Sequence, residues 1–434
     1  MKVAANVAVV GAGWAGMAAA IAHAQAGRQV TVFEAARTLG GRARELPLTL
    51  PDGRDILVDN GQHILIGAYT DSLRLMRKVG VDPDQALLRL PLALVFPDGT
   101  GLALSWGSAP WDGLAGILRA QGWTWRDRLS LLRAATGWQL SGFTCAPQTT
   151  VAELCAPLTR RLLDRFIEPL CVSALNTPAA AASGAVFLRV LRDALFGAPG
   201  SSNLLLPTKD LSALFPQAAA DWLRQRGHTV HLGHRVRSLT PDTQGPAGRW
   251  LADGEPFDRV ILATSASDAA HASTEWSLHA PEPIASSLRS WAAATQALHH
   301  EAITTVYALA ASGLTRPMLA LPATAQHPAQ FVFDRGQLGG PRGLLAFVIS
   351  ASTGEREALQ RRVVAQAREQ LGLVVEPLRT ITEKRATFAC TPGLQRPPMA
   401  VAPGLLACGD YIAGPYPATL EGAVRSGRDA GNLP

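Results

Sequence analysis

Cysteine and lysine are both scarce in this sequence. Its 434 residues include only five cysteines, none of them in a C-x-x-C pair, at positions 145, 155, 171, 390 and 408. An odd number of widely separated cysteines indicates neither a disulfide framework nor a zinc site, so a reducing cytoplasm is the expected compartment. Lysine occurs only at positions 2, 78, 209 and 384, and arginine therefore supplies nearly all of the positive charge.

A concentrated basic segment is also missing. The formal net charge is +6 and the pI about 9.4, yet the arginines are scattered and do not form a stripe with interleaved aromatic residues. This distribution is typical of an arginine-rich protein surface and predicts no nucleic-acid partner. Peripheral contact with an anionic membrane, at the inner face of the cytoplasmic membrane, stays open.

The apolar runs are interrupted. Residues 3–27 carry no Lys, Arg, Asp or Glu, as in a signal peptide or a membrane span, but glycines at positions 11, 13 and 16 break the run where a strand should become a helix. A second uncharged run, 172–188, is too short to cross a bilayer and contains Asn176 and Pro178. We therefore expect no transmembrane segment.

The composition that remains is that of a globular protein, with 47% apolar and 17% charged residues. At its amino end, Asn6 to Val10 reads as a strand, Trp14 to Gln25 as a helix and Val30 to Phe33 as a second strand. The pattern Gly11-x-Gly13-x-x-Gly16 falls between the first strand and the helix, and an acid, Glu34, ends the second strand. In this context the glycines bring the backbone close to a dinucleotide pyrophosphate, and the acid accepts hydrogen bonds from a ribose.

Two further motifs separate FAD from NAD. Two glycines and several arginines follow the second strand, in the run Arg37-x-x-Gly40-Gly41-Arg42-x-Arg44, and a polar turn from Asp59 to His63 follows a third strand. Near the carboxyl end, Gly409-Asp410 follows an apolar strand, and Thr419-Leu420-Glu421-Gly422 begins a helix.

Together these motifs resemble the flavin-containing amine oxidase and phytoene desaturase superfamily. The resemblance implies that Asp410 binds the flavin ribityl chain, that the Leu420 backbone N–H reaches the flavin pyrimidine edge, and that the Val236 backbone meets adenine. Residues 411–418 contain no cysteine, so we expect FAD to be bound non-covalently. The expected cofactor-binding residues are Gly11, Gly13, Ala15, Gly16, Glu34, Gly41, Arg42, Val236, Gly409, Asp410 and Leu420.

A narrower resemblance is to the hydroxysqualene dehydroxylases of bacterial squalene and hopanoid biosynthesis. It is carried by segments spread over most of the chain, at 59–69, 166–178, 186–193, 210–216 and 383–388. The resemblance implies a lipophilic isoprenoid substrate, hydroxysqualene, which reduced FAD converts to squalene; the electron donor is not identified by any motif. A polyisoprenoid desaturase, a flavin amine oxidase and a prenyl-binding escort protein that does no redox chemistry are the alternatives.

The positions of the motifs predict an α/β fold with a discontinuous Rossmann-type FAD-binding domain and a second, α+β substrate domain, as in the amine oxidases. The FAD-binding domain is expected at residues 1–80, 205–270 and 385–434, and the substrate-binding domain at 81–204 and 271–384. Residues 235–239 and 258–264 are expected to be β-rich segments that return the chain to the first domain.

The sequence offers fewer candidates for catalytic residues than for cofactor-binding residues. His63, in the turn near the flavin, and the carboxylates Glu168 and Asp193, in family-like segments, are candidates for the acid that the reaction needs, although each also fits a structural role.

Five tryptophans, at 106, 111, 123, 125 and 138, accompany arginines and fit either a core and pocket lining or a bilayer surface. Three histidines at 228, 231 and 234 lack a completing ligand, so no metal site is expected.

Overall fold

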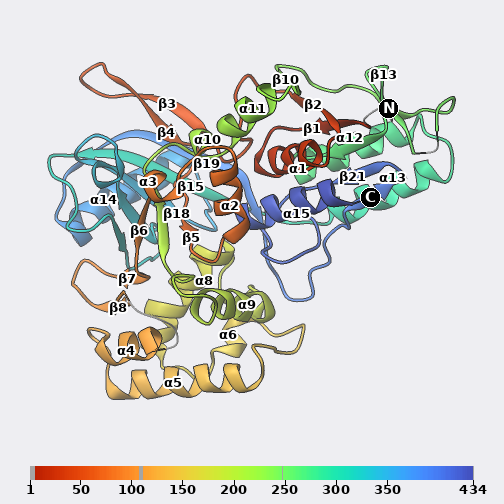
Figure 1. The fold of residues 1–434 in the computed structure, drawn as a ribbon. Coiled ribbons are helices and arrows are strands. Elements are labelled where there is room, and N and C mark those ends of the chain that lie inside the picture. The colour runs from red at the N-terminus through yellow and green to blue at the C-terminus, as the bar shows by residue number, and fades with distance from the viewer. Residues whose placement is uncertain (1–4, 107–110, 247, 434) are drawn as a thin grey trace.

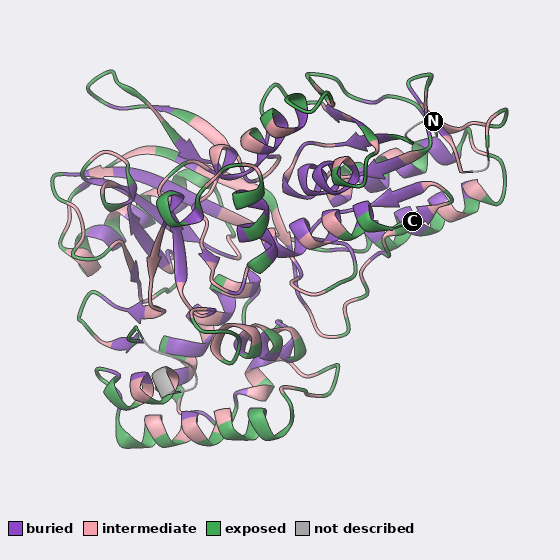
Figure 2. Cartoon of the chain, viewed as in Figure 1, coloured by how far each residue is buried: buried purple, intermediate pink, exposed green. Residues whose placement is uncertain are grey.

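The computed structural model describes residues 5–106, 111–246 and 248–433, and its chain forms three regions (Figure 1). A parallel-sheet region contains both ends of the chain. An antiparallel-sheet region stands beside it, and a helical lobe, residues 111–195, lies below. Buried residues concentrate in the two sheet regions, whereas the lowest helix of the lobe is largely exposed (Figure 2).

The parallel-sheet region joins strands from distant parts of the chain. Its strands run in the order β10-β2-β1-β14-β21-β20, and every neighbouring pair is parallel except β21 with β20. The central strands are apolar runs, as expected for parallel strands covered on both faces. The strands are β1 Asn6–Val10, β2 Gln29–Glu34, β10 Thr229–Leu232, β14 Arg259–Leu262, β20 Ala400–Ala402 and β21 Leu405–Ala407.

Helix α1 packs very closely against α15, which comes from the other end of the chain. A Cβ atom added at Gly427 would lie 2.1 Å from the Ala15 carbonyl oxygen, so only glycine permits this approach. Helices α12 and α13 pack against each other, and the Trp291 indole N–H donates to the Pro398 carbonyl, 2.8 Å away. The helices of this region are α1 Trp14–Gln25, α2 Thr70–Lys78, α10 Leu211–Leu214, α11 Pro216–Arg224, α12 Ala266–Ser277, α13 Ile284–Gln296 and α15 Leu420–Asn432.

The antiparallel-sheet region has the strand order β16-β17-β18-β15-β19. Alternation separates its two faces: Val306 and Phe347 pack in one core with Val363 of α14, whereas Tyr307 and Phe333 face the opposite core. The elements are β15 His300–Ala310, β16 Met318–Ala320, β17 Phe331–Asp334, β18 Leu344–Ile349, α14 Arg356–Leu371, β19 Val375–Phe388 and a 3₁₀ turn Arg335–Leu338.

Short strands connect the regions in four small sheets, ordered β3-β4, β7-β8, β5-β9-β6 and β11-β12-β13. They lie at β3 Glu45–Thr49, β4 Asp55–Asp59, β5 Leu65–Ile66, β6 Leu87–Leu90, β7 Ala93–Val95, β8 Gly101–Ala103, β9 Leu204–Pro207, β11 Leu239–Pro241, β12 Trp250–Ala252 and β13 Glu255–Phe257, with helix α3 at Pro83–Ala86.

The helical lobe is held together by a buried carboxylate. Asp127 caps the start of α5 together with Thr124 and also accepts from the Thr159 hydroxyl at the start of α7, 2.5 Å away. Because burial opposes ionisation while these hydrogen bonds favour it more strongly, the pKa of Asp127 is lowered. The lobe contains α4 Trp111–Arg119, α5 Trp125–Leu140, α6 Val151–Leu154, α7 Arg160–Leu162, a π-helical turn Leu163–Ile167, α8 Glu168–Leu175 and α9 Gly184–Leu195.

The expected fold class is confirmed, because a parallel α/β sheet is built from three separate parts of the chain and a second region is α+β. The domain boundaries stay a prediction, and the one at residue 271 cuts through α12. One expected β-rich segment differs: residues 234–238 are not in a strand, and β11 begins only at Leu239. Among the described residues, no helix combines the length and apolar character needed to span a membrane.

Candidate active site

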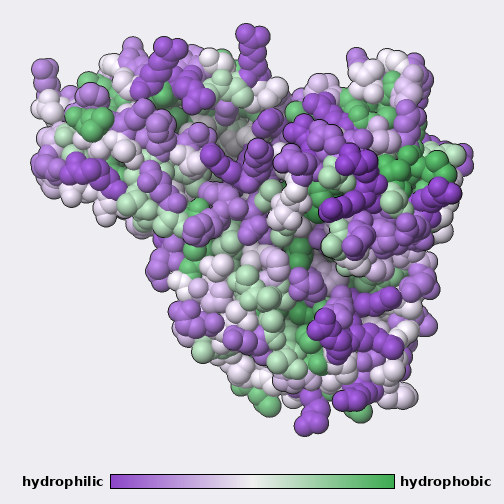
Figure 3. Space-filling view, turned by 180° about the vertical axis from the view of Figure 1, so that it is seen from behind, coloured by the Kyte–Doolittle hydropathy of each residue, from purple (hydrophilic) through white to green (hydrophobic). Residues whose placement is uncertain are grey.

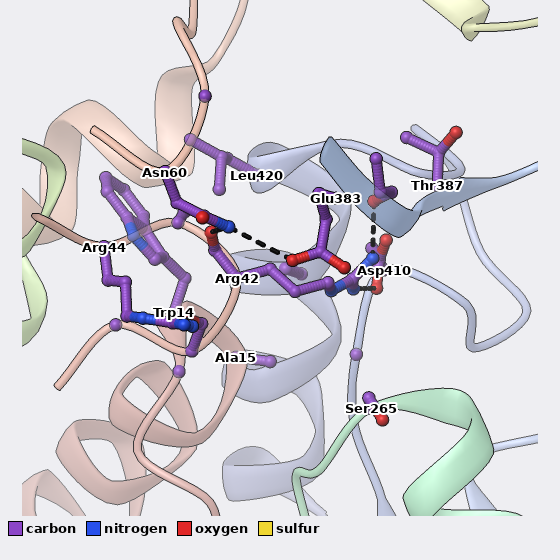
Figure 4. Close-up of a pocket in the computed structure, with 18 of the residues that line it drawn as sticks. Trp14, Ala15, Arg42, Arg44, Asn60, Ser265, Glu383, Thr387, Asp410 and Leu420 are labelled. Atoms are coloured by element: carbon purple, nitrogen blue, oxygen red, sulfur yellow. Dashed lines mark hydrogen bonds and ion pairs between the residues drawn. The ribbon is translucent and has the colours of Figure 1, made fainter. Parts of the chain in front are cut away.

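A cavity of about 680 Å³ runs from the parallel sheet to the antiparallel sheet. At one end it is lined by the turn after β1, by β2 and by the start of α15; at the other it is lined by α8, β15, β17 and β18. This volume falls in the range of roughly 300 to 1,000 Å³ that is usual for small-molecule sites. Figure 4 shows the middle of the cavity, where Arg42, Asn60, Glu383 and Asp410 converge from different elements.

The glycine turn between β1 and α1 has the geometry that a pyrophosphate requires. Gly11 has a φ of +110°, a conformation that favours glycine. A Cβ at Gly16 would lie 1.9 Å from the Gly11 carbonyl oxygen, so the helix can pack this closely on the turn only with glycine at position 16. A Cβ at Gly13 would meet no atom closer than 3.9 Å, and Gly13 lines the cavity. Protein atoms therefore leave open the space above the start of α1, where an anion is stabilised.

Glu34 and Val236 line the same end of the cavity. The Glu34 carboxylate accepts from the Ala12 and Ala36 backbone N–H groups, each 2.8 Å away, and these bonds fix its position beside the glycine turn. Val236 is nearly buried in an extended connection after β10. Ala15, Gly41 and Gly409 also line the cavity.

Arg42 and Asp410 form an ion pair between two motifs that lie 368 residues apart (Figure 4). Arg42 also donates to the Ala386 carbonyl, 2.7 Å away. Burial disfavours the Arg42 charge, but Asp410 and the nearby Glu383 outweigh this cost and raise the pKa of Arg42. The pair holds a fixed positive charge and a buried carboxylate in the middle of the cavity.

The carboxyl-terminal helix points its start into the cavity. Thr419 caps α15 by accepting from the Gly422 N–H at 3.0 Å, and Leu420 is the first helical residue. Leu420 lines the cavity (Figure 4). The partial positive charge of a helix start favours negative charge on a group bound there.

These features fit FAD. The open space beside Gly13 would receive the pyrophosphate, and Glu34 would bind the ribose. Asp410 and the start of α15 would hold the ribityl chain and the flavin ring, which gains negative charge on reduction. Residues 411–418 offer no thiol, and Cys408, which directly follows β21, is fully buried in the core, where burial raises the pKa of its thiol.

The turn after β4 brings His63 into the cavity wall. Its Nδ1 lies 2.6 Å from the Gly61 carbonyl oxygen, and because a carbonyl can only accept, Nδ1 carries the proton. Burial lowers the pKa of His63, and the charge of Arg42 adds to this effect. His63 is therefore a neutral imidazole with Nε2 as an acceptor, which suits it to accept a hydrogen bond and not to donate a proton.

A buried carboxyl supports this turn from behind. The Asp59 Oδ1 atom accepts from the Leu211 N–H at 2.8 Å, and the Tyr307 hydroxyl donates to the Asp59 carbonyl at 2.9 Å. Burial raises the pKa of Asp59 to about 7. Asp59 does not line the cavity, so its contribution is to hold the backbone from which Asn60 and His63 project.

Glu383 was not among the candidates chosen from the sequence. Its Oε2 atom accepts from the Asn60 side-chain amide at 3.1 Å, and both residues line the cavity (Figure 4). The lining residues that the structure describes include four acids, and Glu34, Asp268 and Asp410 are the other three. Glu383 begins the family-like segment 383–388, but its partner Asn60 is 323 residues away, so no local pattern marked its carboxylate as part of the site.

The other two carboxylates chosen from the sequence lie outside the cavity wall. Glu168, at the start of α8, accepts from the Ala179 N–H at 3.2 Å, and burial raises its pKa. Asp193, on α9, pairs with Arg189 and Arg192. A hydrogen bond to Asp193 also contributes, after burial, to a Tyr416 pKa of about 12. These contacts give both carboxylates structural roles.

The far end of the cavity is apolar. The inner face of the antiparallel sheet and the end of α8 supply aliphatic and aromatic side chains, namely Val172, Leu175, Ile303, Phe331, Phe333 and Val348. This wall suits a hydrocarbon chain, and polar residues at its border include Ser173 and Asn176 from α8 and its end, and Ser350 after β18.

The three histidines after α11 do not converge on a common point. His231 and His234 both pack against the Phe33 ring, and His234 is paired with Asp253 at 3.1 Å. Within the described residues, no group of three or more His, Cys, Asp and Glu side chains is arranged to hold a metal ion.

Comparison with known proteins agrees with this geometry. The family model described as flavin containing amine oxidoreductase matches residues 14–432. A hydroxysqualene dehydroxylase from Rhodopseudomonas palustris is 28% identical over 466 residues, covering 99% of this chain and 98% of that protein. Another from Zymomonas mobilis is 26% identical, covering 98% of each.

Shorter and more distant similarities extend the set. A zeta-carotene desaturase from Synechocystis is 39% identical over 75 residues, which cover 17% of this chain and 14% of that protein. The crystal structure of an oxidoreductase from Methanosarcina mazei has a TM-score of 0.71 at 16% identity, covering 98% of this chain and 99% of that one. This last likeness shows the fold alone.

The family match spans nearly the whole described chain and includes Glu34, Arg42, Asp410 and the start of α15, all of which line the cavity. FAD is the cofactor that this family and these residues share. The chain therefore belongs to the flavin-containing amine oxidoreductase family and is an FAD-dependent oxidoreductase.

Proposed function

We propose that this protein is a hydroxysqualene dehydroxylase, which replaces the allylic hydroxyl of hydroxysqualene by hydrogen to give squalene. The observation that carries the proposal is a single cavity with flavin-binding motifs at one end, an apolar wall at the other and an unassigned carboxyl, Glu383, between them. The names of the full-length relatives support the same substrate.

The reaction consumes one hydride and one proton and releases water. Reduced FAD supplies the hydride when it is bound. The protein must then provide a proton to the leaving hydroxyl and an environment in which a delocalised allylic cation survives. The apolar wall would exclude water from that cation, since water would otherwise capture it.

Glu383 is our proposed proton donor. Asn60 holds the carboxyl in place through Oε2. After proton transfer, the carboxylate would stabilise the nearby positive charge, and the neutral His63 would accept a hydrogen bond from the departing water.

The test is an anaerobic reaction of prereduced enzyme with hydroxysqualene. The flavin absorbance should return with a yield of squalene equal to the flavin that is reoxidised. Squalene mixed with the oxidised enzyme should leave the absorbance unchanged, because squalene carries no leaving group. A reduced enzyme that stays reduced in the presence of hydroxysqualene contradicts the proposal.

A desaturase of a polyisoprenoid is the second candidate, favoured by the similarity to a zeta-carotene desaturase. It predicts the opposite direction of hydride transfer. Bleaching of the oxidised enzyme by a partly saturated isoprenoid, without turnover of hydroxysqualene by the reduced enzyme, would select it.

We also propose that FAD is held without a covalent bond, because residues 411–418 contain no cysteine and the Cys408 side chain is buried. The purified protein should be yellow, and acid precipitation should release the colour into the supernatant. Colour that stays in the pellet after washing with denaturant would contradict this assignment.

A further inference from the structure

Helix α5 presents an unusual exposed face. Twelve large hydrophobic residues are exposed in the described chain, and six of them fall within residues 106–140: Trp106, Leu114, Leu118, Trp125, Leu129 and Leu140. The other six are spread over the rest of the chain, at Leu57, Phe196, Leu232, Leu278, Val374 and Leu433. Isolated exposed apolar residues are normal, but a local cluster indicates an interaction surface.

Three of these six residues, Trp125, Leu129 and Leu140, lie on one side of α5. Leu129, Thr136 and Leu140 follow Trp125 by four, eleven and fifteen residues, which are close to whole turns of a helix with 3.6 residues per turn. Trp125 is 66% exposed and Leu140 is 85% exposed. We call this side, with its flanking residues Arg126 and Arg133, the α5 face.

The charges beside the α5 face have one sign. Arg119, Arg126 and Arg133 are exposed, and the Arg128 guanidinium lies 5.0 Å from the centre of the Trp125 ring. The only acid among residues 113–152, Asp127, is 3% exposed and is committed to the cap of α5. A second copy of this face would bring arginines against arginines, whereas an anionic partner would pair with them.

The α5 face lies at the outer edge of the molecule. Helix α5 runs along the bottom of the view in Figure 1, and the space-filling view from behind shows hydrophobic side chains between hydrophilic ones along the same edge (Figure 3). Trp123 and Trp138 are buried beneath it, so two of the tryptophans fix the helix while Trp125 is free to contact a partner. An apolar stripe with tryptophan and flanking arginines is the composition of a helix that lies in a bilayer interface.

We propose that the α5 face docks on a bilayer that contains anionic lipids, with Trp125, Leu129 and Leu140 entering the interface and the arginines contacting lipid phosphates. The helices of this lobe continue into α8, whose residues Val172 and Leu175 line the cavity. Docking would therefore bring the lobe that supplies part of the apolar wall up to the membrane, with α5 on its outer side and α8 on its inner side (Figure 1). This inference does not depend on the proposed reaction.

Vesicle flotation of the FAD-loaded protein tests it. Vesicles of phosphatidylcholine with 30% phosphatidylglycerol should carry the wild type upward, and vesicles of phosphatidylcholine alone should carry at least about tenfold less. Two double variants are compared with the wild type: Leu129→Ser with Leu140→Ser, and Arg126→Glu with Arg133→Glu. In each, the fraction of protein bound to anionic vesicles should fall about tenfold. Raising the salt concentration should weaken the binding of the wild type.

The matched control is Leu278→Ser, Val374→Ser, which removes two equally exposed side chains, 77% and 83% exposed, far from α5 in the sequence. This control should float like the wild type, and flavin absorbance and circular dichroism should show that all variants are folded. Equal flotation of the α5 variants and the wild type overturns the proposal, as does no flotation with anionic vesicles. Self-association that the α5 variants abolish, without vesicle binding, would overturn it in favour of a second copy.

Discussion

The two ends of the cavity differ in how far apart their residues lie along the chain. At the nucleotide end, Gly11, Gly16 and Glu34 come from one β-α-β unit, and Glu34 bonds to Ala12 only 22 residues away. At the substrate end, Asn60 meets Glu383 across 323 residues. A site made within one unit can be recognised as a motif, whereas a site made by tertiary packing depends on the whole fold.

The largest expected effect is at the nucleotide end. Gly16→Ala places a Cβ 1.9 Å from the Gly11 carbonyl oxygen, a backbone atom that cannot move without opening the turn. We expect the purified variant to contain no FAD, as measured by the ratio of its flavin absorbance to its protein absorbance. Gly137→Ala, in an exposed position of α5 with no atom within 4 Å of the new Cβ, should keep its FAD.

At the substrate end, Glu383→Gln should separate chemistry from cofactor binding. The amide keeps the size of the side chain but cannot donate a carboxyl proton, and general acid catalysis contributes about 10²- to 10⁴-fold. We expect the rate of flavin reoxidation by hydroxysqualene to fall by this factor while the FAD content stays constant. Glu376→Gln, exposed on the same strand, should react at the wild-type rate, and a Glu383→Gln variant that did so would remove Glu383 from the mechanism.

Glu34→Ala should have a smaller effect at the nucleotide end. It removes charge-assisted hydrogen bonds to the ribose, worth about 1.5 to 3 kcal/mol in total, or about 10- to 100-fold in the Kd of FAD. Titration of apoprotein with FAD, followed by flavin fluorescence, measures the change. Glu255→Ala, on the exposed hairpin of β12 and β13, is the control, and an unchanged Kd for Glu34→Ala would mean that the ribose lies elsewhere.

The smallest effect concerns the helix behind the glycine turn. Burial lowers the pKa of His23 on α1 from 6.5 to about 3, and the charge of Arg28 adds to this effect. The folded state thus favours the neutral ring, so its contribution to stability is present above pH 6.5 and is lost as the pH falls towards 3.

We expect a loss of about 1.4 kcal/mol in the free energy of unfolding for each pH unit in this window. Urea denaturation at pH 7 and pH 5 should show that His23→Gln loses less stability than the wild type over the same interval. His271→Gln, which changes an exposed histidine, should follow the wild type. Parallel curves for His23→Gln and the wild type would show that His23 does not titrate in this way.

The nucleotide end of the cavity could be predicted well because its residues are close together in the sequence. Strand β1 and helix α1 have the expected bounds because apolar periodicity and glycine spacing act within a few residues. The chain near Val236 differs from the expected strand, since no neighbouring strand pairs with it there.

Long-range contacts limited the prediction of the rest. Glu168 and Asp193 stood in recognisable segments, but only the packing of α8 and α9 reveals that they bond to Ala179 and to nearby arginines. The tryptophans divided in the same way: Trp123 and Trp138 are buried, Trp106 and Trp125 are exposed, and the side chain of Trp111 lies outside the described residues. The sequences around these tryptophans look alike, so only the tertiary contacts show which of the side chains are buried and which are exposed.

The close packing of α15 on α1 has a consequence for synthesis in the cell. Gly427 and Gly431 lie against Ala15 and Ala22, and Asp410 pairs with Arg42, so the glycine turn and Arg42 meet partners that are synthesised much later. A nascent chain that has exposed only the glycine turn lacks the partner surface of α1 and half of the flavin site. We therefore expect FAD to bind only after α15 has been synthesised, and we expect a chain truncated before α15 to expose the surface of α1 that Gly427 and Gly431 cover.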